Sequence, residues 1–275
     1  MPPILLHYET HGVSGGDRPG AADGDAKPWI LLVHGMLSSR SQWMPNLPAL
    51  TEQYRAVVIE LLGHGRSPSP PTPAAYTPQA YGAQFEAIRA LLGIERWYVI
   101  GQSLGAALSL RYTLDHPERV IAQVFTNSNS ALAPPGWDDQ IRPFIEKQAD
   151  EYRRDGRDAI RRNRLNPTAA KWLDDKVRAA FVEDVALHDP EGLAMTGVHT
   201  TVGSSVYTRA AETAVPTLLV VGEREERFAA SRRYAEETFP DIQVVPTTAG
   251  HASNLGAADV FNEAVLAFFA EHPPA

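Results

Sequence analysis

The most constraining feature of the sequence is the run Gly101-Gln102-Ser103-Leu104-Gly105. A β-rich run, 97–100, precedes it, and a run with helical character, 106–116, follows. A serine between two glycines at such a junction predicts a sharp strand-to-helix turn, because a Cβ at either glycine would collide with neighbouring backbone. The turn would lift the Ser103 hydroxyl clear of a sheet, where it could attack an acyl carbon.

Three other apolar runs end in residues that could complete a site around this serine. Each run has the length and composition of a buried strand. In chain order they are 29–33 followed by His34-Gly35-Met36, 217–221 followed by Gly222-Glu223-Arg224-Glu225-Glu226, and 242–245 followed by Ala249-Gly250-His251. The resulting order of serine, acid and histidine is the one expected on a scaffold with a G-x-S-x-G turn.

Strand-like runs alternate with amphipathic helical runs along most of the chain. This alternation predicts an α/β fold with a mostly parallel central sheet and helices on both faces. The predicted strands are 4–9, 29–34, 55–61, 97–101, 120–126, 217–221 and 242–245. The predicted helices are 41–53 with Ser41 as its N-cap, 78–93, 104–116, 231–239 and 260–271, and 12–28 is a predicted surface loop.

The strand rhythm stops between Asn127 and Val215, where about ninety residues with helical character intervene. Such an excess over an ordinary crossover predicts an inserted helical cap over the active site. We therefore expect residues 1–127 and 214–275 to form the core and 128–213 to form the cap. Apolar residues at helical spacing, among them Phe144 and Trp172, are expected mostly in the core of this cap.

The length of 275 residues suits one large α/β domain, with or without an insertion. A formal net charge of -8 opposes attraction to nucleic acid or to anionic lipid, so neither partner is expected. The arginines between 153 and 164 are interleaved with acids, which predicts a solvated helical face with paired charges.

No run approaches the ~20 apolar residues of a membrane span, and the first residues do not resemble a secretory signal. A cytoplasmic location is therefore expected.

The sequence contains no cysteine, which excludes disulfides, thiolate metal sites and a thiol nucleophile. It contains no evident metal-ligand cluster or glycine-rich nucleotide motif, so no cofactor and no metal are expected. For the eight histidines other than His251, structural roles are expected rather than catalytic ones. His34 and His64 follow strands in glycine turns and are expected to make local hydrogen bonds, while His188 lies in no motif.

Together these motifs resemble the α/β-hydrolase fold superfamily, in its serine-nucleophile, capped, esterase-like branch. The residues that carry the resemblance are His34-Gly35, the run Gly63-His64-Gly65-Arg66-Ser67, the run 101–105, Gly222 with its acids, and Gly250-His251. The resemblance spans nearly the whole chain outside 128–213. It implies the fold and a serine-histidine-acid triad, but it does not identify the substrate, because this fold hosts many chemistries.

The resemblance also implies a role for individual residues. Ser103 is the expected nucleophile and His251 the expected base, because a free hydroxyl is almost fully protonated at neutral pH. The family most often has aspartate three residues after the strand-ending glycine, and Glu225 occupies that position here, with Glu223 and Glu226 as alternatives. The expected oxyanion-hole donors are the backbone N–H groups of Met36 and Leu104. Candidate substrate-binding residues are Gln102, Trp43, Asn129 and Trp137.

A serine at the elbow excludes the haloalkane dehalogenases and epoxide hydrolases of this fold, which use aspartate there. The simplest expectation is hydrolysis of a small carboxylic ester or lactone through an acyl-enzyme, with a small-molecule acyl compound as the substrate. The main alternative is a carbon-carbon bond hydrolase of the meta-cleavage-product type, which would need an inward-facing cation such as Arg111. Perhydrolase activity, thioester or amide substrates, and a non-catalytic binding module are further alternatives. The oligomeric state is left open.

Overall fold

The fold is built on one sheet of seven strands in the order β1-β3-β2-β4-β5-β6-β7, in a computed structural model that describes residues 5–13 and 27–274. Only β1 is antiparallel to its neighbour, β3, and every other pair is parallel. The predicted mostly parallel α/β architecture is therefore confirmed. The strands are β1 Tyr8–His11, β2 Trp29–Val33, β3 Arg55–Ile59, β4 Trp97–Gly101, β5 Val120–Thr126, β6 Thr217–Gly222 and β7 Gln243–Thr247.

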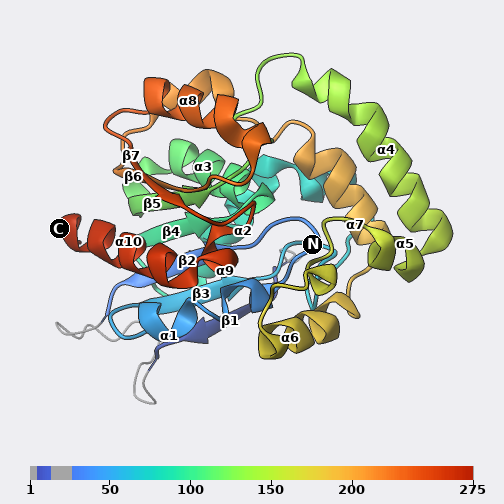
Figure 1. Ribbon diagram of the computed structural model, residues 1–275, viewed down its shortest axis with the longest axis horizontal. Coiled ribbons are helices and arrows are strands. Elements are labelled where there is room, and N and C mark those ends of the chain that lie inside the picture. The colour runs from blue at the N-terminus through green and yellow to red at the C-terminus, as the bar shows by residue number, and fades with distance from the viewer. Residues whose placement is uncertain (1–4, 14–26, 275) are drawn as a thin grey trace.

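Helices cover both faces of the sheet (Figure 1). Alternate residues of β2 divide between the two sides: Leu31 and Val33 pack in the cluster that contains residues of α2 and α3, whereas Ile30 and Leu32 pack in the cluster with α10. This period of two is what a strand buried on both faces requires. The helices of the core are α1 Leu47–Leu50, α2 Pro78–Leu91, α3 Leu104–Asp115, α8 Ala229–Thr238, α9 Ser253–Gly256 and α10 Ala258–Glu271.

A run of helices separates β5 from β6. It contains α4 Trp137–Asp155, α5 Arg157–Arg162, α6 Asp175–Val185 and α7 Pro190–Thr196. These four helices gather at one side of the sheet, on the right of Figure 1. We call residues 128–213 the helical segment. Its helices fall where the inserted cap is expected, while its boundaries as a domain stay a prediction.

Two aromatic side chains predicted in the interior of the helical segment lie on its surface instead. Phe144 is 59% exposed and Trp172 is 60% exposed. The segment buries other positions of the same helical pattern, such as Phe181, which packs in a small apolar cluster with Leu173 and Val177. Apolar spacing alone therefore identified the helices but not every residue of their buried faces.

The predicted helix 41–53 is wrong. Residues Arg40–Trp43 form a single 3-10 turn capped by Ser39, and only Leu47–Leu50 is α-helical. Pro45 accounts for the interruption, because proline has no N–H to continue the helical hydrogen bonds and its ring clashes with the preceding turn. At the other end of the chain, β1 begins at Tyr8. Most of the predicted loop 12–28 lies outside the described residues.

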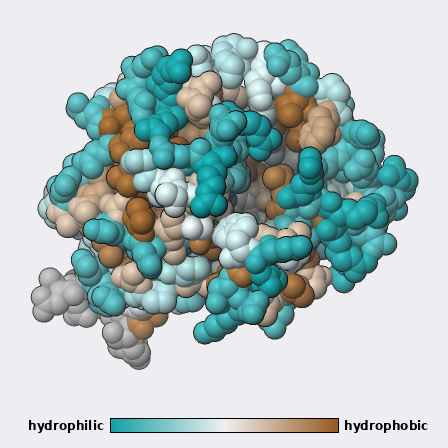
Figure 2. Space-filling model, viewed as in Figure 1, coloured by the Kyte–Doolittle hydropathy of each residue, from teal (hydrophilic) through white to brown (hydrophobic). Residues whose placement is uncertain are grey.

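The arginine-rich stretch of the helical segment is a solvated, charge-paired surface, as predicted. Arg153 pairs with Glu191 at 2.9 Å, and Arg162 pairs with Asp155 at 2.7 Å. Hydrophilic side chains dominate this side of the molecule (Figure 2). Within the described ranges, no helix is long and apolar enough to cross a membrane.

Three buried histidines pin the turns that follow β2 and β3. His34 Nε2 accepts the N–H of Leu61, and His64 Nε2 accepts the N–H of Leu37, each at 3.0 Å. His188, from the helical segment, accepts the N–H of Gly65 at 2.9 Å through Nδ1. A ring nitrogen that accepts a hydrogen bond carries no proton, so all three rings must be neutral in the folded protein.

These neutral rings predict a loss of stability in mild acid. Burial lowers the pKa of His34 and of His188 to about 4. In the unfolded chain these histidines bind protons near pH 6.5. Their contribution to the free energy of unfolding is therefore fully present above that pH. It falls as the pH drops toward 4, by at most about 1.4 kcal/mol per pH unit for each histidine. Urea unfolding between pH 7.5 and 4.5 measures this slope.

His188→Gln is the matched variant, because glutamine retains an acceptor for Gly65 but does not titrate. We expect it to flatten the slope. An unfolding free energy that is equal at pH 7 and pH 5 in the parent protein would contradict the assignment.

Candidate active site

The carboxyl ends of the six parallel strands meet at one edge of the sheet. Val33 at the end of β2 pairs with Gly101 at the end of β4, and Gly101 pairs with Phe125 near the end of β5. Strands β6 and β7 continue the same parallel register. Residues that follow these strands are therefore neighbours in space, although they are far apart in the sequence, and this edge is where ligands bind in open α/β sheets.

Ser103 lies in the tight turn between β4 and α3. Its backbone has φ 54° and ψ -119°, an unusual conformation for a residue with a side chain. A Cβ at Gly105 would collide with the carbonyl oxygen of Val33, and one at Gly101 would lie 2.5 Å from the carbonyl oxygen of Gly105. The two glycines are thus required by the close approach of α3 to β2 and β4. The Ser103 carbonyl oxygen accepts the Ser128 hydroxyl at 2.6 Å, which helps to hold the turn.

Ser103, His251 and Glu225 lie in one hydrogen-bonded row. Ser103 Oγ is 2.8 Å from His251 Nε2, and His251 Nδ1 is 2.8 Å from Glu225 Oε2. The imidazole therefore bridges a hydroxyl and a carboxylate. Such an arrangement can take a proton from the hydroxyl while the carboxylate orients the ring and stabilises its cation.

The geometry distinguishes between the three candidate acids. The side chain of Glu225 is only 5% exposed and points at His251, whereas the side chain of Glu223 is 55% exposed and pairs with Arg232. Glu226 is also exposed. Burial raises the pKa of Glu225. The hydrogen bond and charge of His251, together with the Asn127 amide, lower it by more than burial raises it, so that the pKa of Glu225 lies below the ordinary value. Glu225 is thus held as a carboxylate beside the ring.

Two asparagines after β5 hold this carboxylate. The Asn127 amide donates to Glu225 Oε2 at 3.0 Å and to the Gly222 carbonyl oxygen at 2.9 Å, while its own oxygen accepts the Gly222 N–H. The Asn129 amide donates to Glu225 Oε1 at 3.2 Å. Asn129 was predicted to bind substrate; its amide contacts the acid, and a role in substrate binding stays a prediction. The position of both residues after a neighbouring parallel strand is the only sequence signal that could have indicated these contacts.

The expected oxyanion-hole residues lie on two sides of Ser103. A Cβ at Gly35 would be 2.9 Å from the Ser103 Cβ, so the turn that carries the Met36 N–H passes directly against the serine. Leu104 is the first residue of α3, and its N–H is one of the helix donors without an intrahelical acceptor. The placement of the Met36 and Leu104 N–H groups is compatible with an oxyanion hole, and this role stays a prediction.

The remaining predicted binding residues have different surroundings. Gln102 is 4% exposed, and its amide donates to the His251 carbonyl oxygen at 3.3 Å, so it supports the site from within. The prediction that Trp43 lines the pocket is wrong: its side chain is fully buried in the core, near Phe261. Trp137 begins α4 and is half-buried, and a role in binding stays a prediction. Arg111 donates to the Ser205 carbonyl oxygen at 3.1 Å.

A hollow of about 390 Å³ opens beside the row, lined by Arg224, Glu225, Glu226, Arg227, Gly250 and His251. It borders the carboxylate and imidazole and is flanked by two arginines. Among the described residues, no group of three or more histidine, aspartate or glutamate side chains is arranged to hold a metal ion.

Comparison with known proteins gives one family. The family model described as the alpha/beta hydrolase fold matches residues 28–258. The chain is 28% identical over 265 residues to a Bacillus subtilis protein named putative 2-succinyl-6-hydroxy-2,4-cyclohexadiene-1-carboxylate synthase, across 93% of this chain and 96% of that protein. It is 26% identical over 277 residues to the putative carbamate hydrolase RutD of Stutzerimonas stutzeri, across 97% of each.

Solved structures share the same fold. The enol-lactonase from Burkholderia xenovorans LB400 superimposes with a TM-score of 0.78 at 23% identity, over 96% of this chain and 95% of that one. MenH from S. aureus superimposes with a TM-score of 0.81 at 17% identity, over 98% and 99% of the two chains. At these identities the similarity establishes the architecture and not the reaction.

The contact of Asn129 with Glu225 predicts a measurable effect on any reaction that uses the row. Asn129→Ala removes one donor from the carboxylate, so the pKa of Glu225 should rise and the acid limb of the pH-rate profile should move to higher pH. We expect kcat to fall about tenfold, because Glu225 would then hold the His251 ring less firmly. The profile of kcat between pH 5 and 9 checks this.

Asn163→Ala, which removes a hydrogen bond to Tyr152 in the helical segment, is the control for a general loss of stability. An acid limb that stays at the same pH in Asn129→Ala would show that the amide does not tune the row.

Proposed function

Because the chain belongs to the α/β-hydrolase fold family, we propose that it is a serine hydrolase that cleaves small carboxylic esters or lactones through an acyl-enzyme. The observation that carries the proposal is the row from Ser103 through His251 to Glu225, with 2.8 Å at each step. The proposal assigns Ser103 as nucleophile, His251 as general base and Glu225 as the residue that orients the imidazole.

In the proposed first step, Ser103 Oγ attacks the acyl carbon as its proton passes to His251 Nε2. Glu225, ionised and almost fully buried, stabilises the imidazolium that forms. The negative charge that develops on the carbonyl oxygen is expected to be bound by the N–H groups of Met36 and Leu104. Each such donor contributes about 3 to 4 kcal/mol to the stability of the transition state.

In the second half, the bond to the leaving oxygen breaks and His251 returns its proton to that oxygen. Water then attacks the acyl-serine, again with His251 as the base, and releases the acid and the free serine. Every group required for these steps comes from a turn after one of the parallel strands.

Two observations weigh against the alternatives. For a carbon-carbon bond hydrolase, the candidate cation Arg111 already donates through Nη2 to the Ser205 carbonyl oxygen, although Arg224 and Arg227 beside the row keep this class as the second candidate. A non-catalytic binding module would have no use for a serine in a strained backbone conformation beside an imidazole. The two curated relatives bear the names of different reactions, a synthase and a carbamate hydrolase, so they do not select a substrate.

The proposal predicts serine-dependent hydrolysis of simple esters. Initial rates with p-nitrophenyl esters from acetate to dodecanoate, and with a small lactone, should show turnover that Ser103→Ala lowers by at least about 10³-fold, because the nucleophile is lost. The substitution removes a single oxygen and should leave the thermal unfolding temperature close to that of the parent.

Ser109→Ala is the matched control, since Ser109 lies in α3, the helix that follows Ser103, and its hydroxyl donates within that helix, to the Ala106 carbonyl oxygen. Equal turnover by Ser103→Ala and the parent would disprove the assignment of Ser103, whereas no turnover by the parent on any of these substrates would remove simple esters and lactones.

A further inference from the structure

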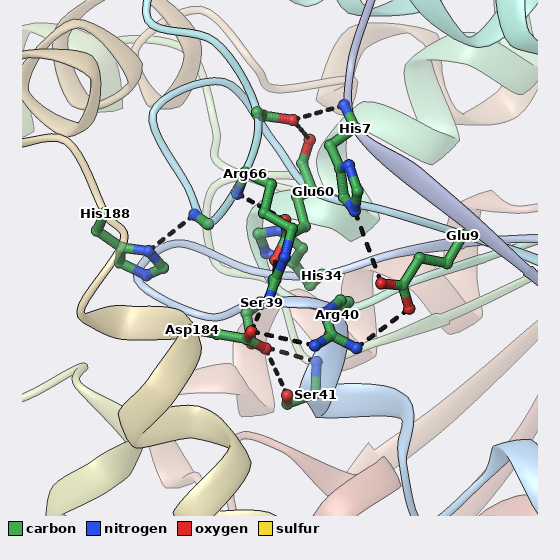
Figure 3. Close-up of polar contacts among 12 residues, drawn as sticks. His7, Glu9, His34, Ser39, Arg40, Ser41, Glu60, Arg66, Asp184 and His188 are labelled. Carbon is green, nitrogen blue, oxygen red and sulfur yellow. Dashed lines mark hydrogen bonds and ion pairs between the residues drawn. The ribbon is translucent and has the colours of Figure 1, made fainter.

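A buried carboxylate joins the helical segment to the turn that carries Met36 (Figure 3). Asp184, near the end of α6, has a side chain that is only 1% exposed. Its Oδ2 accepts the hydroxyls of Ser39 at 2.9 Å and of Ser41 at 2.5 Å. Its Oδ1 accepts Arg66 Nη1 at 2.8 Å and lies 3.4 Å from Arg40 Nη2.

These partners keep Asp184 ionised. Burial raises the pKa of Asp184, but the hydrogen bonds from Ser41, Arg66 and Ser39 outweigh it, and the pKa lies below its ordinary value. Oδ2 binds two hydroxyls of the turn after β2, whereas Oδ1 binds Arg40 of that same turn and Arg66 of the turn after β3. A charge buried this deeply is stable only while these donors stay in place, so the contact favours one position of α6 on the core.

The turn 35–41 is held at several points, and Asp184 holds its far end. Near its start, the Ser38 N–H donates to the Gly35 carbonyl oxygen at 3.2 Å. Leu37 has φ 59°, a strained value for leucine, and its N–H is bound by His64. Ser39 Oγ, besides donating to Asp184, accepts the Ser41 N–H at 3.1 Å. The Met36 N–H therefore lies in a short, strained turn that is tied at one end to the core and at the other to Asp184.

We propose that Asp184 is a positioning residue for the oxyanion hole: through Ser39 and Ser41 it fixes the turn 35–41 so that the Met36 N–H points at the reacting oxygen. The inference rests on the proposed function, since it gives that site a further residue. It also makes the oxyanion hole depend on the position of α6. The helical segment thereby contributes to the chemistry without contacting the reacting atoms.

The physical reason is the steep dependence of catalysis on donor geometry. A displacement of about 1 Å at a catalytic group can lower a rate by about 100-fold, while the same displacement changes global stability little. Without the carboxylate, the Ser39 and Ser41 hydroxyls lose their common acceptor, and the strained turn at Leu37 loses one of its restraints. The Ser103, His251 and Glu225 row does not touch Asp184, so it should remain assembled.

The test compares an ester with its thionoester, in which sulfur replaces the carbonyl oxygen. Sulfur accepts hydrogen bonds poorly, so the ratio of the two kcat values reports the oxyanion hole in particular. The variants are Asp184→Asn and the double variant Ser39→Ala with Ser41→Ala. In both, we expect kcat for the ester to fall about tenfold or more, KM to stay within about twofold, and the ester-to-thionoester ratio to fall with kcat.

Thr196→Val is the matched control. It removes another buried hydrogen bond between the helical segment and the core, from Thr196 to the Leu62 carbonyl oxygen at 3.0 Å, without touching the turn 35–41. We expect it to lower the unfolding temperature and to leave the ratio unchanged. If Asp184→Asn does not fold, the serine variants, which only remove hydroxyls, still give the measurement.

The outcomes separate this inference from the proposed function. Folded Asp184 or serine variants with the parent ratio would overturn the positioning role while leaving the hydrolase intact. A ratio that falls equally in Thr196→Val would also overturn it, because any loosening of the segment would then suffice. A parent enzyme whose turnover of esters does not depend on Ser103 would overturn the proposed function and this inference with it.

Discussion

The parallel pairing of β2, β4, β5, β6 and β7 is the constraint on which the rest of the structure depends. It brings the residues after five strands to one edge, so that Ser103, Glu225 and His251 can meet although the sequence separates them widely. The Ser103 turn depends on the same pairing, because Gly105 packs against the Val33 carbonyl of the adjacent strand. The strained backbone of Ser103 is stable only because the sheet and α3 hold it from both sides.

Buried polar contacts complete what the sheet begins. At one end of the row, Asn127 and Asn129 bind the Glu225 carboxylate, and at the other, Asp184 binds the turn that passes beside Ser103. Burying such groups is costly, and here each is matched by donors that also fix its direction. Glu225 needs this support more than an aspartate would, since its additional methylene gives the carboxylate another rotatable bond. The helical segment is thus linked to the edge of the sheet by electrostatics as well as by packing.

Much of this could be predicted from the sequence wherever the signal is local. Strands β4 and β5 have their predicted bounds because each is a mostly apolar run, and the glycines and serine of 101–105 can form only a few kinds of turn. The helix predicted at 41–53 failed because Pro45 interrupts it, and Trp43 proved to be a core residue rather than a pocket residue. The roles of Asn129 and Asp184 could not be predicted, because their partners lie 96 and 145 residues away along the chain. For Asn129 a single sequence offers only its position after β5 as a signal, and for Asp184 it offers none.

The role of Ser103 as nucleophile is tested most directly by locating the adduct of a fluorophosphonate probe by peptide mass spectrometry on the folded, unmodified chain. If Ser103 is the nucleophile, the probe should form one adduct, on Ser103, and should form it much more slowly in His251→Ala because the hydroxyl then lacks its base. An adduct on another residue, or none on a folded sample at a probe concentration that labels a known serine hydrolase, would contradict the claim that this edge of the sheet activates Ser103.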